Sequence, residues 1–496
     1  MSLLHPDRLF ATDPGTRAIA RRLFDSIADL PILSPHGHTS AQWFAENQPF
    51  PNPAALFLQP DHYLFRMLYS QGISLDAIGI LPRPPKTGTS RKPPSPSSEP
   101  APESEAITYA DPREVWRLFA ANYHLFRGTP SRIWLDYAFS ELFQLGEAGR
   151  LSAKTADHYY DTISAALQTP EFLPRALYAR FHIEVLATTD DPSASLTHHQ
   201  ALASDPSWHG RIIPTFRPDP VLDPDHEHFT HSLHKLGELT REDTHTWKGY
   251  LNALRKRRLF FKANGATATD HGHPTAHTAD LTPEEAGRLF TNIIGIHPRH
   301  QSTTPKEHDL FRAHMLTEMA RMSLEDGLVM QLHCGAFRNH NRVVYKKYGS
   351  DKGADIPQPT DYVHALRPVL SRYGNEPDLR IIVFTLDESA YSRELAPLAG
   401  HYPALKLGPP WWFHDSPEGM LRYRECVTET AGFYNSVGFN DDTRAFFSIP
   451  GRHDTARRMD ATYLARLVAE HRLDEDEAFE LMQDLTYNFA NKAYRL

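Results

Sequence analysis

Residues 30–44 read LPILSPHGHTSAQWF, a short apolar run that is soon followed by two histidines separated by one glycine. On a β-strand, residues i and i+2 point the same way, so His36 and His38 would face one side. That geometry suits a metal site, but the chain has 29 histidines, and about two His-x-His pairs are expected by chance. Three are present, so the context of each pair must decide its meaning.

Seven further short runs are apolar on both faces and alternate with helical stretches. Such runs are typical of a parallel sheet covered by helices on each side. Eight strands alternating with helices predict an α/β fold of the (β/α)8 TIM-barrel type. The rival, a doubly wound open sheet, is disfavoured because no Gly-rich phosphate loop follows any run. The predicted strands are LPIL (30–33), IEVLA (183–187), RIIPTF (211–216), RLFFKA (258–263), GLVMQLH (327–333), RIIVFTL (380–386), ALKLG (404–408) and FYNSVGF (433–439).

The spacing of these strands predicts the organisation of the chain. Residues 1–39 would form an N-terminal segment and the first barrel strand, and residues 40–182 a mostly helical insertion between strands 1 and 2. Within that insertion, residues 82–105 are rich in proline, serine and charge and are predicted to be flexible. Residues 183–496 would complete the barrel and end in C-terminal helices.

Composition limits the classes of function. A net charge of −9 over 496 residues argues against nucleic acid or an anionic membrane as a partner. No apolar run approaches the roughly 20 residues that a spanning helix needs, and no secretory signal is visible. Cys334 and Cys426 are too few for a disulfide framework. We therefore expect a cytoplasmic protein that acts on a small molecule, and the sequence is compatible with a homo-oligomer.

Polar, aromatic or ionisable residues follow every predicted strand, at the end where barrel enzymes carry their active sites. This convergence is stronger evidence for a site than any single motif. In strand order these residues are His36 and His38; Thr188, Thr189, Asp190 and Asp191; Arg217 and Asp219; Asp270 and His271; His333, Cys334 and Arg338; Asp387 and Glu388; Trp411 and Trp412; and Asp441, Asp442 and Arg444.

The first histidine pair is the strongest metal candidate. Barrel closure brings the last strand beside the first, so Asp442 or Asp441 could join His36 and His38 around one divalent metal. Imidazole and carboxylate donors favour Zn²⁺, with Mn²⁺ or Fe²⁺ as alternatives in a more open site. His333, across the barrel mouth, would be a further ligand or a substrate contact. By contrast, the His226/His228 pair follows no strand and is interpreted as solvent-facing, and for His271/His273 the two readings weigh equally.

Other candidate residues could have a purely structural role instead of a role in binding or catalysis. The adjacent pair Trp411 and Trp412 would be either core or a stacking wall for a sugar ring. Arg217 and Arg444 would be either structural ion pairs, with Asp219 and Asp442, or clamps for a substrate carboxylate. Asp61-His62-Tyr63 alone would pass as a helix N-terminus.

Several segments resemble one branch of the amidohydrolase superfamily, the uronate (glucuronate) isomerase family. The resemblance runs from about residue 25 to the C-terminus, outside the proline-rich stretch. It is specific because so many separate matches occur in order. The segments are NPAALFLQPDHYLFRMLYSQGI, VLATTDDP, IIPTFRPD, ATDHG, MQLHCGAFRNHN, GPPWWFHDSPEGM and NDDTRAFFSIPGRHDTARR.

The resemblance implies an aldose–ketose isomerase that interconverts D-glucuronate with D-fructuronate, and D-galacturonate with D-tagaturonate. It implies metal ligation by His36, His38 and Asp442. The chain departs from the family pattern at Ser34, where an aspartate is usual, and by an extra residue near Gly451. The remaining expected roles are catalysis by Asp442, Tyr63, His62 and Arg444, and substrate binding by Arg217, His333, Arg338, Trp411, Trp412, Asp270 and His271.

This isomerisation moves a proton from C2 to C1 through an enediol, which needs a base, an acid and stabilisation of the developing oxyanion. As a hypothesis, Asp442 or a metal-bound water assists the transfer with Tyr63 or His62 as partner. One rival is a mononuclear metal-dependent hydrolase of the same superfamily, weakened because strand six ends in TLDES without a histidine. Another is a non-catalytic sugar-acid-binding protein.

Overall fold

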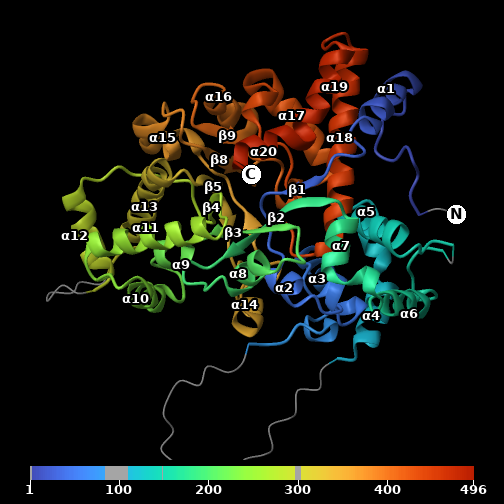
Figure 1. Ribbon diagram of the computed structural model, residues 1–496, viewed down its shortest axis with the longest axis horizontal. Coiled ribbons are helices and arrows are strands. Elements are labelled where there is room, and N and C mark those ends of the chain that lie inside the picture. The colour runs from blue at the N-terminus through green and yellow to red at the C-terminus, as the bar shows by residue number, and fades with distance from the viewer. Residues whose placement is uncertain (1–2, 84–109, 148, 296–302) are drawn as a thin grey trace, which may run out of the picture.

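A computed structural model describes residues 3–83, 110–147, 149–295 and 303–496. Its centre is a parallel seven-stranded sheet in the order β1-β2-β3-β4-β5-β8-β9, with helices arranged around it (Figure 1). The sheet is a TIM-type (β/α) barrel, as predicted. Its strands are β1 (Ile32–Ser34), β2 (Ile183–Asp190), β3 (Arg211–Phe216), β4 (Ala268–His271), β5 (Val329–His333), β8 (Ile381–Phe384) and β9 (Leu405–Leu407). A separate small hairpin pairs β6 (Ala336–Phe337) with β7 (Ile356–Pro357).

The barrel closes through irregular chain rather than through an eighth regular strand. Ser436 forms an isolated parallel bridge with Leu407 of β9. Further along, the His38 N–H donates to the Thr443 carbonyl over 3.0 Å. Residues 436–443 therefore lie between β9 and the chain that leaves β1. Closure brings the two ends of the barrel sequence together at the site.

The eighth predicted strand, residues 433–439, is thus wrong as a regular strand. Phe433–Asn435 form a short 3₁₀ helix, and Gly438 adopts a left-handed φ of 74°. A Cβ at Gly438 would lie 2.9 Å from the Leu485 carbonyl, so this close approach favours glycine. Phe433 packs with the C-terminal helices, whereas Val437 joins the apolar cluster of the barrel strands.

The fourth predicted strand is also wrong. Residues 258–263 form the end of helix α11 (Trp247–Ala263), on which Tyr250, Leu254 and Phe261 are buried at helical spacing. A short apolar run cannot by itself be distinguished from part of a buried helix. The true fourth strand, Ala268–His271, lies in the stretch expected to be the following loop, where its Thr, Asp and His residues hid a fully buried strand.

Between β1 and β2, the regular elements formed by the described residues are all helices. Asp111 caps the helix over residues 112–121 through its side chain, as an Asp-Pro start favours. Residues 84–105 of the predicted flexible segment lie outside the described residues. The α-helices here are α2 (Ala41–Glu46), α3 (His62–Ser70), α4 (Pro112–Ala121), α5 (Pro130–Tyr137), α6 (Ala156–Ala166) and α7 (Pro174–Arg180).

The remaining helices cover the barrel. Helix α1 runs beside α18 (Figure 1), where Ala20 and Leu23 share an apolar cluster with Ala461 and Leu464. The helix that contains Thr282 and Glu285 begins with the predicted capping box. These helices are α1 (Pro14–Asp25), α8 (Thr197–Ser204), α9 (Asp219–Leu222), α10 (Phe229–Thr240), α12 (Pro283–Ile293), α13 (Pro305–Asp326), α14 (Arg342–Tyr348), α15 (Tyr362–Tyr373), α16 (Ala396–Ala399), α17 (Pro417–Ala431), α18 (Ile449–Ala469), α19 (Glu475–Gln483) and α20 (Phe489–Tyr494).

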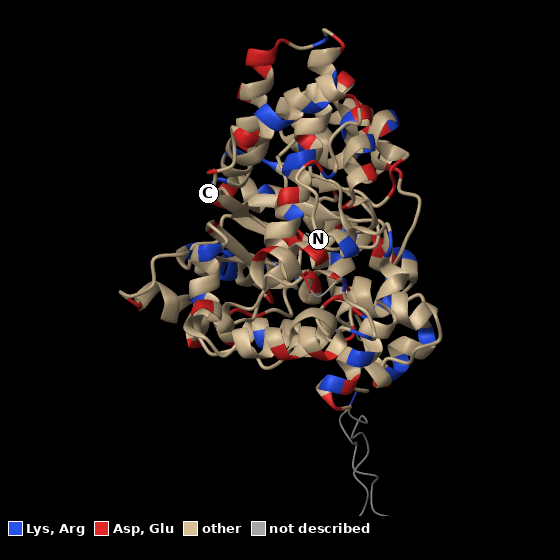
Figure 2. Ribbon diagram, turned by 90° about the vertical axis from the view of Figure 1, so that its right-hand side faces the viewer, with Lys and Arg blue, Asp and Glu red and all other residues tan. Residues whose placement is uncertain are grey.

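Two large apolar cores hold this arrangement. One joins the insertion to the barrel and includes Phe446 and Phe447, which come directly after the site residues of the last barrel segment. The other lies between the outer helices and strands β3, β5, β8 and β9. Acidic and basic residues are interspersed along the outer helices (Figure 2). Within the described residues, no helix combines the length and apolarity needed to cross a membrane.

Candidate active site

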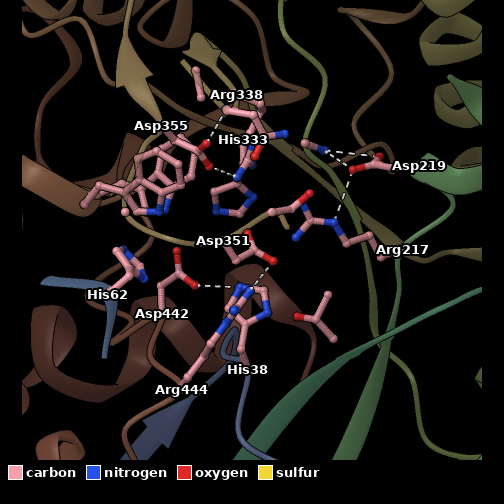
Figure 3. A pocket seen from close by; sticks show the side chains of 18 of the residues that line it. His38, His62, Arg217, Asp219, His333, Arg338, Asp351, Asp355, Asp442 and Arg444 are labelled. Carbon is pink, nitrogen blue, oxygen red and sulfur yellow. Dashed lines mark hydrogen bonds and ion pairs between the residues drawn. The ribbon is translucent and has the colours of Figure 1, made fainter. Parts of the chain in front are cut away.

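A cavity of about 770 Å³ opens at the carboxyl ends of the barrel strands. Figure 3 shows Asp442 and His62 on one side, Arg217 and Asp219 on the opposite side, and His333 between them. The cavity is lined from β1, β2, β3 and β5 and from the segments after β9, so residues far apart in sequence meet here. This is the place where a barrel fold concentrates its chemistry.

Asp442 lies at the centre of a histidine cluster. Its Oδ1 is 3.1 Å from Nε2 of His38 and 3.5 Å from Nε2 of His36. The ring of His333 stacks on that of His36 with centroids 4.5 Å apart. One donor atom each from His36, His333 and Asp442 lies within 4.8 Å of the others. The geometry thus brings together the pair from β1, the end of β5 and the closing segment.

The backbone around the cluster is held firmly. The Gly37 carbonyl, between the two histidines, accepts a 2.9 Å hydrogen bond from Thr189 at the end of β2. Asp442 itself has a left-handed φ of 36°, which is strained for a residue with a Cβ. Such strain persists only where surrounding structure enforces it, and Trp412 and Asp351 on the cavity wall share this feature.

The structure separates the two neighbouring aspartates that the sequence left as alternatives. Asp441 accepts a 3.1 Å hydrogen bond from buried His453 and does not line the cavity. Asp442 lines the cavity and faces His36 and His38. Only Asp442 is therefore placed to share a ligand with the histidine pair.

The protonation state of the cluster suits a metal ion. Burial lowers the pKa of His36 to about 3, so its ring is neutral and keeps a free lone pair. Burial opposes the ionisation of Asp442, but its hydrogen bond with His38 helps to hold the pKa of Asp442 well below its usual range. Nδ1 of His36 and Nε2 of His333 are buried and have no hydrogen-bond partner among the residues that the structure describes. Nitrogen and carboxylate donors of this kind fit a divalent cation such as zinc.

His333 is oriented by a second layer of charge. Its Nδ1 lies 2.6 Å from Oδ1 of Asp270, whose other oxygen is 3.0 Å from Nη1 of Arg217. Arg217 also donates from Nε to Asp219 over 3.1 Å. Asp270 and Asp219 raise the pKa of Arg217 although burial opposes this, so the arginine stays charged. These contacts, from His333 through Asp270 and Arg217 to Asp219, connect the middle of the cavity to its far wall.

The entrance side carries a different set of pairs. Arg444 forms a 3.2 Å ion pair with Asp351, and both side chains are about 40% exposed. Arg338 pairs with Asp355 at 3.0 Å, and its guanidinium lies 5.0 Å from the Trp412 ring centroid. The alternative pairing of Arg444 with Asp442 is not the one observed. These cations stand where a small anion could enter.

His62 and Tyr63 begin helix α3 and lie on the cavity wall. The Asp61 side chain caps this helix by accepting from the Tyr63 N–H over 2.8 Å. Burial and, next, Arg444 lower the pKa of His62 to about 3, and burial raises the pKa of Tyr63 well above 10. Both rings are therefore neutral, so the tyrosine can donate a proton and the histidine can accept one.

Comparisons with known proteins agree over nearly the whole chain. The sequence profile described as glucuronate isomerase matches residues 14–80 and 100–494. The chain belongs to the glucuronate isomerase family. It is 60% identical to the uronate isomerase of Xanthomonas axonopodis pv. citri (strain 306) over 99% of this chain and 98% of that protein. It is also 60% identical to that of Phenylobacterium zucineum (strain HLK1), over 99% and 97% of the two chains.

Two solved structures of the family agree with this fold. The crystal structure of glucuronate isomerase from Caulobacter crescentus matches with a TM-score of 0.91 and 55% identity, over 99% of this chain and 97% of that one. The uronate isomerase from Thermotoga maritima matches with a TM-score of 0.86 and 27% identity, over 99% of each chain. The chain is accordingly an isomerase with the family's barrel.

Most of the residues expected at the site of this glucuronate isomerase family member line the one cavity. Two that were expected to bind substrate, Asp270 and His271, are fully buried and are not part of its lining. Trp411 is buried beside His333, whereas Trp412 faces the cavity more openly. The expected site residues that do line the cavity are His36, His38, His62, Tyr63, Arg217, His333, Arg338, Trp411, Trp412, Asp442 and Arg444.

Sequence reasoning missed several residues of the site. Asp351 and Asp355 lie in a loop before β7, far from any predicted strand end, and no local signal marked them. Arg452 was noted only as part of a family motif; it is 2% exposed, ion-paired with Asp415 and 3.6 Å from the Trp134 ring centroid. Conversely, Asp387 follows β8 but caps the Thr360 N–H outside the cavity.

The departure from the family pattern at Ser34 is visible in the structure. Ser34 ends β1 and is 1% exposed. Its Oγ has no hydrogen-bond partner among the described residues, so it gives His36 no charged support. An aspartate at this place would add a buried negative charge behind the cluster.

Proposed function

We propose that this chain interconverts D-glucuronate with D-fructuronate, and D-galacturonate with D-tagaturonate. The observation that carries this proposal is the position of Asp442, 3.1 Å from His38 and 3.5 Å from His36 in the cavity of a glucuronate isomerase family member. The reaction is a proton shift from C2 to C1 through an enediol. It needs neutral and charged proton carriers within reach of two adjacent carbons.

One divalent cation, Zn²⁺ by preference and Mn²⁺ or Fe²⁺ as alternatives, would be held by His36, His38 and Asp442. His333 would be a further ligand or would touch the substrate. When bound, such a cation supplies Lewis-acid stabilisation of negative charge on the sugar oxygens. The neutral ring of His36 supports this assignment, as do the nitrogens of His36 and His333 that have no hydrogen-bond partner among the described residues.

The chain's own residues would carry the proton. Asp442, ionised in the cluster, accepts a proton, and His62 or Tyr63 across the cavity wall acts as its partner. Asp442 and His62 lie on the same side of the cavity in Figure 3, which suits transfer between neighbouring carbons. Burial behind Trp411 and Trp412 keeps bulk water away from the enediol.

The carboxylate of the uronate would bind at the entrance side. Within the described parts of the chain, Arg444 is ion-paired with Asp351 alone and is partly exposed, whereas Arg217 already contacts Asp219 and Asp270. Arg444 is therefore the freer guanidinium, and Arg338 stands nearby on the face of Trp412. Arg217 instead keeps Asp270 and, through it, His333 in position. This division assigns anion binding to one wall and ring orientation to the other.

A metal-dependent hydrolase remains the alternative reaction on this fold. It fits less well because β8 is followed by Thr385, Leu386 and Asp387, and Asp387 faces away from the cavity. A non-catalytic sugar-acid-binding protein would need the cavity but not Asp442. The product formed from the substrate distinguishes both alternatives from the isomerase.

The deciding experiment incubates purified protein with D-glucuronate or D-galacturonate, with and without added Zn²⁺ or Mn²⁺, and follows ketose formation. Asp442→Asn should abolish turnover while circular dichroism stays unchanged. Asp243→Asn, at an exposed carboxylate, is the matched control and should keep wild-type turnover. Binding without ketose, or hydrolysis of esters or amides alone, would reject the isomerase.

A further inference from the structure

A second group of metal-type donors lies on the opposite wall of the barrel mouth. It consists of Asp219, the first residue of α9 after β3, with His271 at the end of β4 and His273 two residues later. One donor atom from each lies within 4.8 Å of the others. None of the three belongs to the Asp442 cluster, and Figure 3 shows Asp219 across the cavity from Asp442.

The two histidines have nitrogens without partners in a buried place. His273 is 3% exposed, and neither of its ring nitrogens has a hydrogen-bond partner among the described residues. His271 is fully buried, and its Nδ1 also lacks a partner. Buried polar groups in proteins are nearly always satisfied, so these three nitrogens need an explanation.

The local geometry prepares His271 to act as a ligand. Its Nε2 lies 3.1 Å from Oγ1 of Thr269, which can accept the ring N–H and leave the lone pair on Nδ1. A hydrogen bond to the other ring nitrogen is how proteins usually orient a metal-binding histidine. Burial lowers the pKa of His271 to about 3 and also lowers that of His273, in keeping with neutral rings.

Asp219 supplies a fixed carboxylate. It accepts the Gly272 N–H over 2.9 Å and the Arg217 Nε–H over 3.1 Å, and its Oδ1 is 3.7 Å from Nε2 of His273. A Cβ at Gly272 would lie 2.3 Å from Arg217 Nη2, so the chain passes tightly against this pair. Asp219 and Asp270 both contact Arg217, while Asp223 and Arg312 also act electrostatically on His273. Oδ1 of Asp219 is the carboxylate oxygen that approaches His273.

We propose that Asp219, His271 and His273 form a second divalent-cation site, separate from the Asp442 cluster. Two imidazole nitrogens and one carboxylate oxygen make a donor set suited to Zn²⁺. Asp219 and His273 line the cavity, so the ion has a path of entry. The cation would tie the end of β3 to the end of β4 and hold Asp219, and with it Arg217, in place.

The test measures tightly bound zinc by mass spectrometry after zinc loading and gel filtration against a weak chelator. Wild type should keep about two zinc ions per chain, and His273→Gln and Asp442→Asn about one each. The double variant should keep none. His226→Ala, a partly exposed histidine on the same cavity wall, is the matched control and should keep both ions.

A cobalt titration of Asp442→Asn keeps the second site open to refutation even if the His273 variant folds poorly. One tight Co²⁺ with visible d–d absorption should remain in Asp442→Asn and be lost when His273→Gln is added; because His36, His38 and His333 are intact in both variants, this loss supports the second site. No tight Co²⁺ in Asp442→Asn, or His273→Gln with the zinc content of wild type, would overturn it in favour of buried water at His273. If Asp442→Asn keeps all the zinc of wild type, the second site stands and the metal of the proposed isomerase fails.

Discussion

Two His-x-His pairs in this chain follow barrel strands and meet a carboxylate, yet their surroundings differ. His36 and His38 meet Asp442, which comes from the segment that closes the barrel. The pair at His271 and His273 meets Asp219 from the neighbouring strand end, and Asp219 is already bonded to Arg217. The first group has no arginine in contact with its carboxylate among the described residues, whereas the second does.

Exposure separates the two groups at His38 only. The His38 side chain is 21% exposed to the cavity, whereas those of His36 and His273 are 1% and 2% exposed. A reacting sugar can approach the first cluster at His38, while in the second group both histidines are covered and the charge of Asp219 is balanced by Arg217. The comparison teaches that a shared motif does not imply a shared role: access and the nearest counter-charge separate a centre for chemistry from one for structure.

The largest effect on activity is expected from Asp442→Asn, which tests whether the first cluster is the chemical centre. Loss of the ionised carboxylate removes both a proton carrier and a proposed ligand, and we expect kcat to fall about 10³-fold or more. The measurement is the initial rate of ketose formation from D-glucuronate, with the melting temperature as control. Turnover within tenfold of wild type would show that the first cluster is not the chemical centre.

The two arginines can be compared directly. Arg444→Gln should lower kcat/KM about 10²-fold, mainly through KM, because it removes the freer partner for the substrate carboxylate. Its melting temperature should change little. Arg217→Gln should instead lower the melting temperature, since buried Asp270 and Asp219 would lose their cation. Equal effects of the two substitutions on KM would contradict the assignment of substrate-carboxylate binding to Arg444 and of His333 positioning to Arg217.

Asp190, at the end of β2, is a carboxylate with no lysine or arginine partner among the described residues, and its Oδ2 lies 3.9 Å from Nε2 of His199. Burial raises its pKa to about 6, although the Thr188 hydroxyl hydrogen bond opposes this. Because the folded pKa lies above the unfolded one, the contribution of Asp190 to the free energy of unfolding should fall by about 2 kcal/mol, discounted for partial exposure, as pH rises from about 4 to about 6. Neighbouring His199, whose pKa burial lowers to about 4, contributes in the opposite direction over the same range.

Asp190→Asn should remove the contribution of Asp190, so the slope of the unfolding free energy against pH should differ from that of wild type by this amount in denaturant unfolding at a series of pH values. The same substitution at exposed Asp243 should leave the slope as in wild type. An unchanged slope in Asp190→Asn would show that Asp190 is ionised at low pH and has a cationic partner in solution.

The smallest effect is expected from a substitution at Thr269, which tests cation affinity at the group of Asp219, His271 and His273. Thr269→Val removes the hydrogen bond to Nε2 of His271 but keeps the shape of the side chain. If His271 binds a cation, its affinity should fall about tenfold, measured by competition with a chelator of known strength. Zinc affinity at the Asp442 cluster should not change in the same variant. A loss at both sites would mean that the substitution acts through the fold.

Much of the fold could be predicted because it is written in local periodicity. The runs that became β2, β3, β5 and β8 are apolar enough to be found, and the proline-led helix starts carry their own capping signals. Residues 258–263 and 268–271 were exchanged because a buried helix end can resemble a strand, and a buried strand with Thr, Asp and His resembles a loop. Local pattern does not reveal which of the two the core selects.

The candidate site divides in the same way. His36 and His38 could be recognised by themselves, and Asp442 followed once a barrel was assumed. The choice of Asp442 over Asp441 depended on His453, which holds Asp441 away from the cavity. Asp351 and Asp355 had no signal, because a loop residue acquires meaning only from the arginine that it meets.

By itself, the sequence determined the strand and helix pattern, the barrel class and the histidine pair that ends the first strand. Only the tertiary structure decided which carboxylates face which histidines and arginines, and it moved Asp270 and His271 behind the wall of the cavity. The physical reason is range. Periodicity and capping act over a few residues, whereas the contacts of the site join strand ends hundreds of residues apart and form only when the sheet closes.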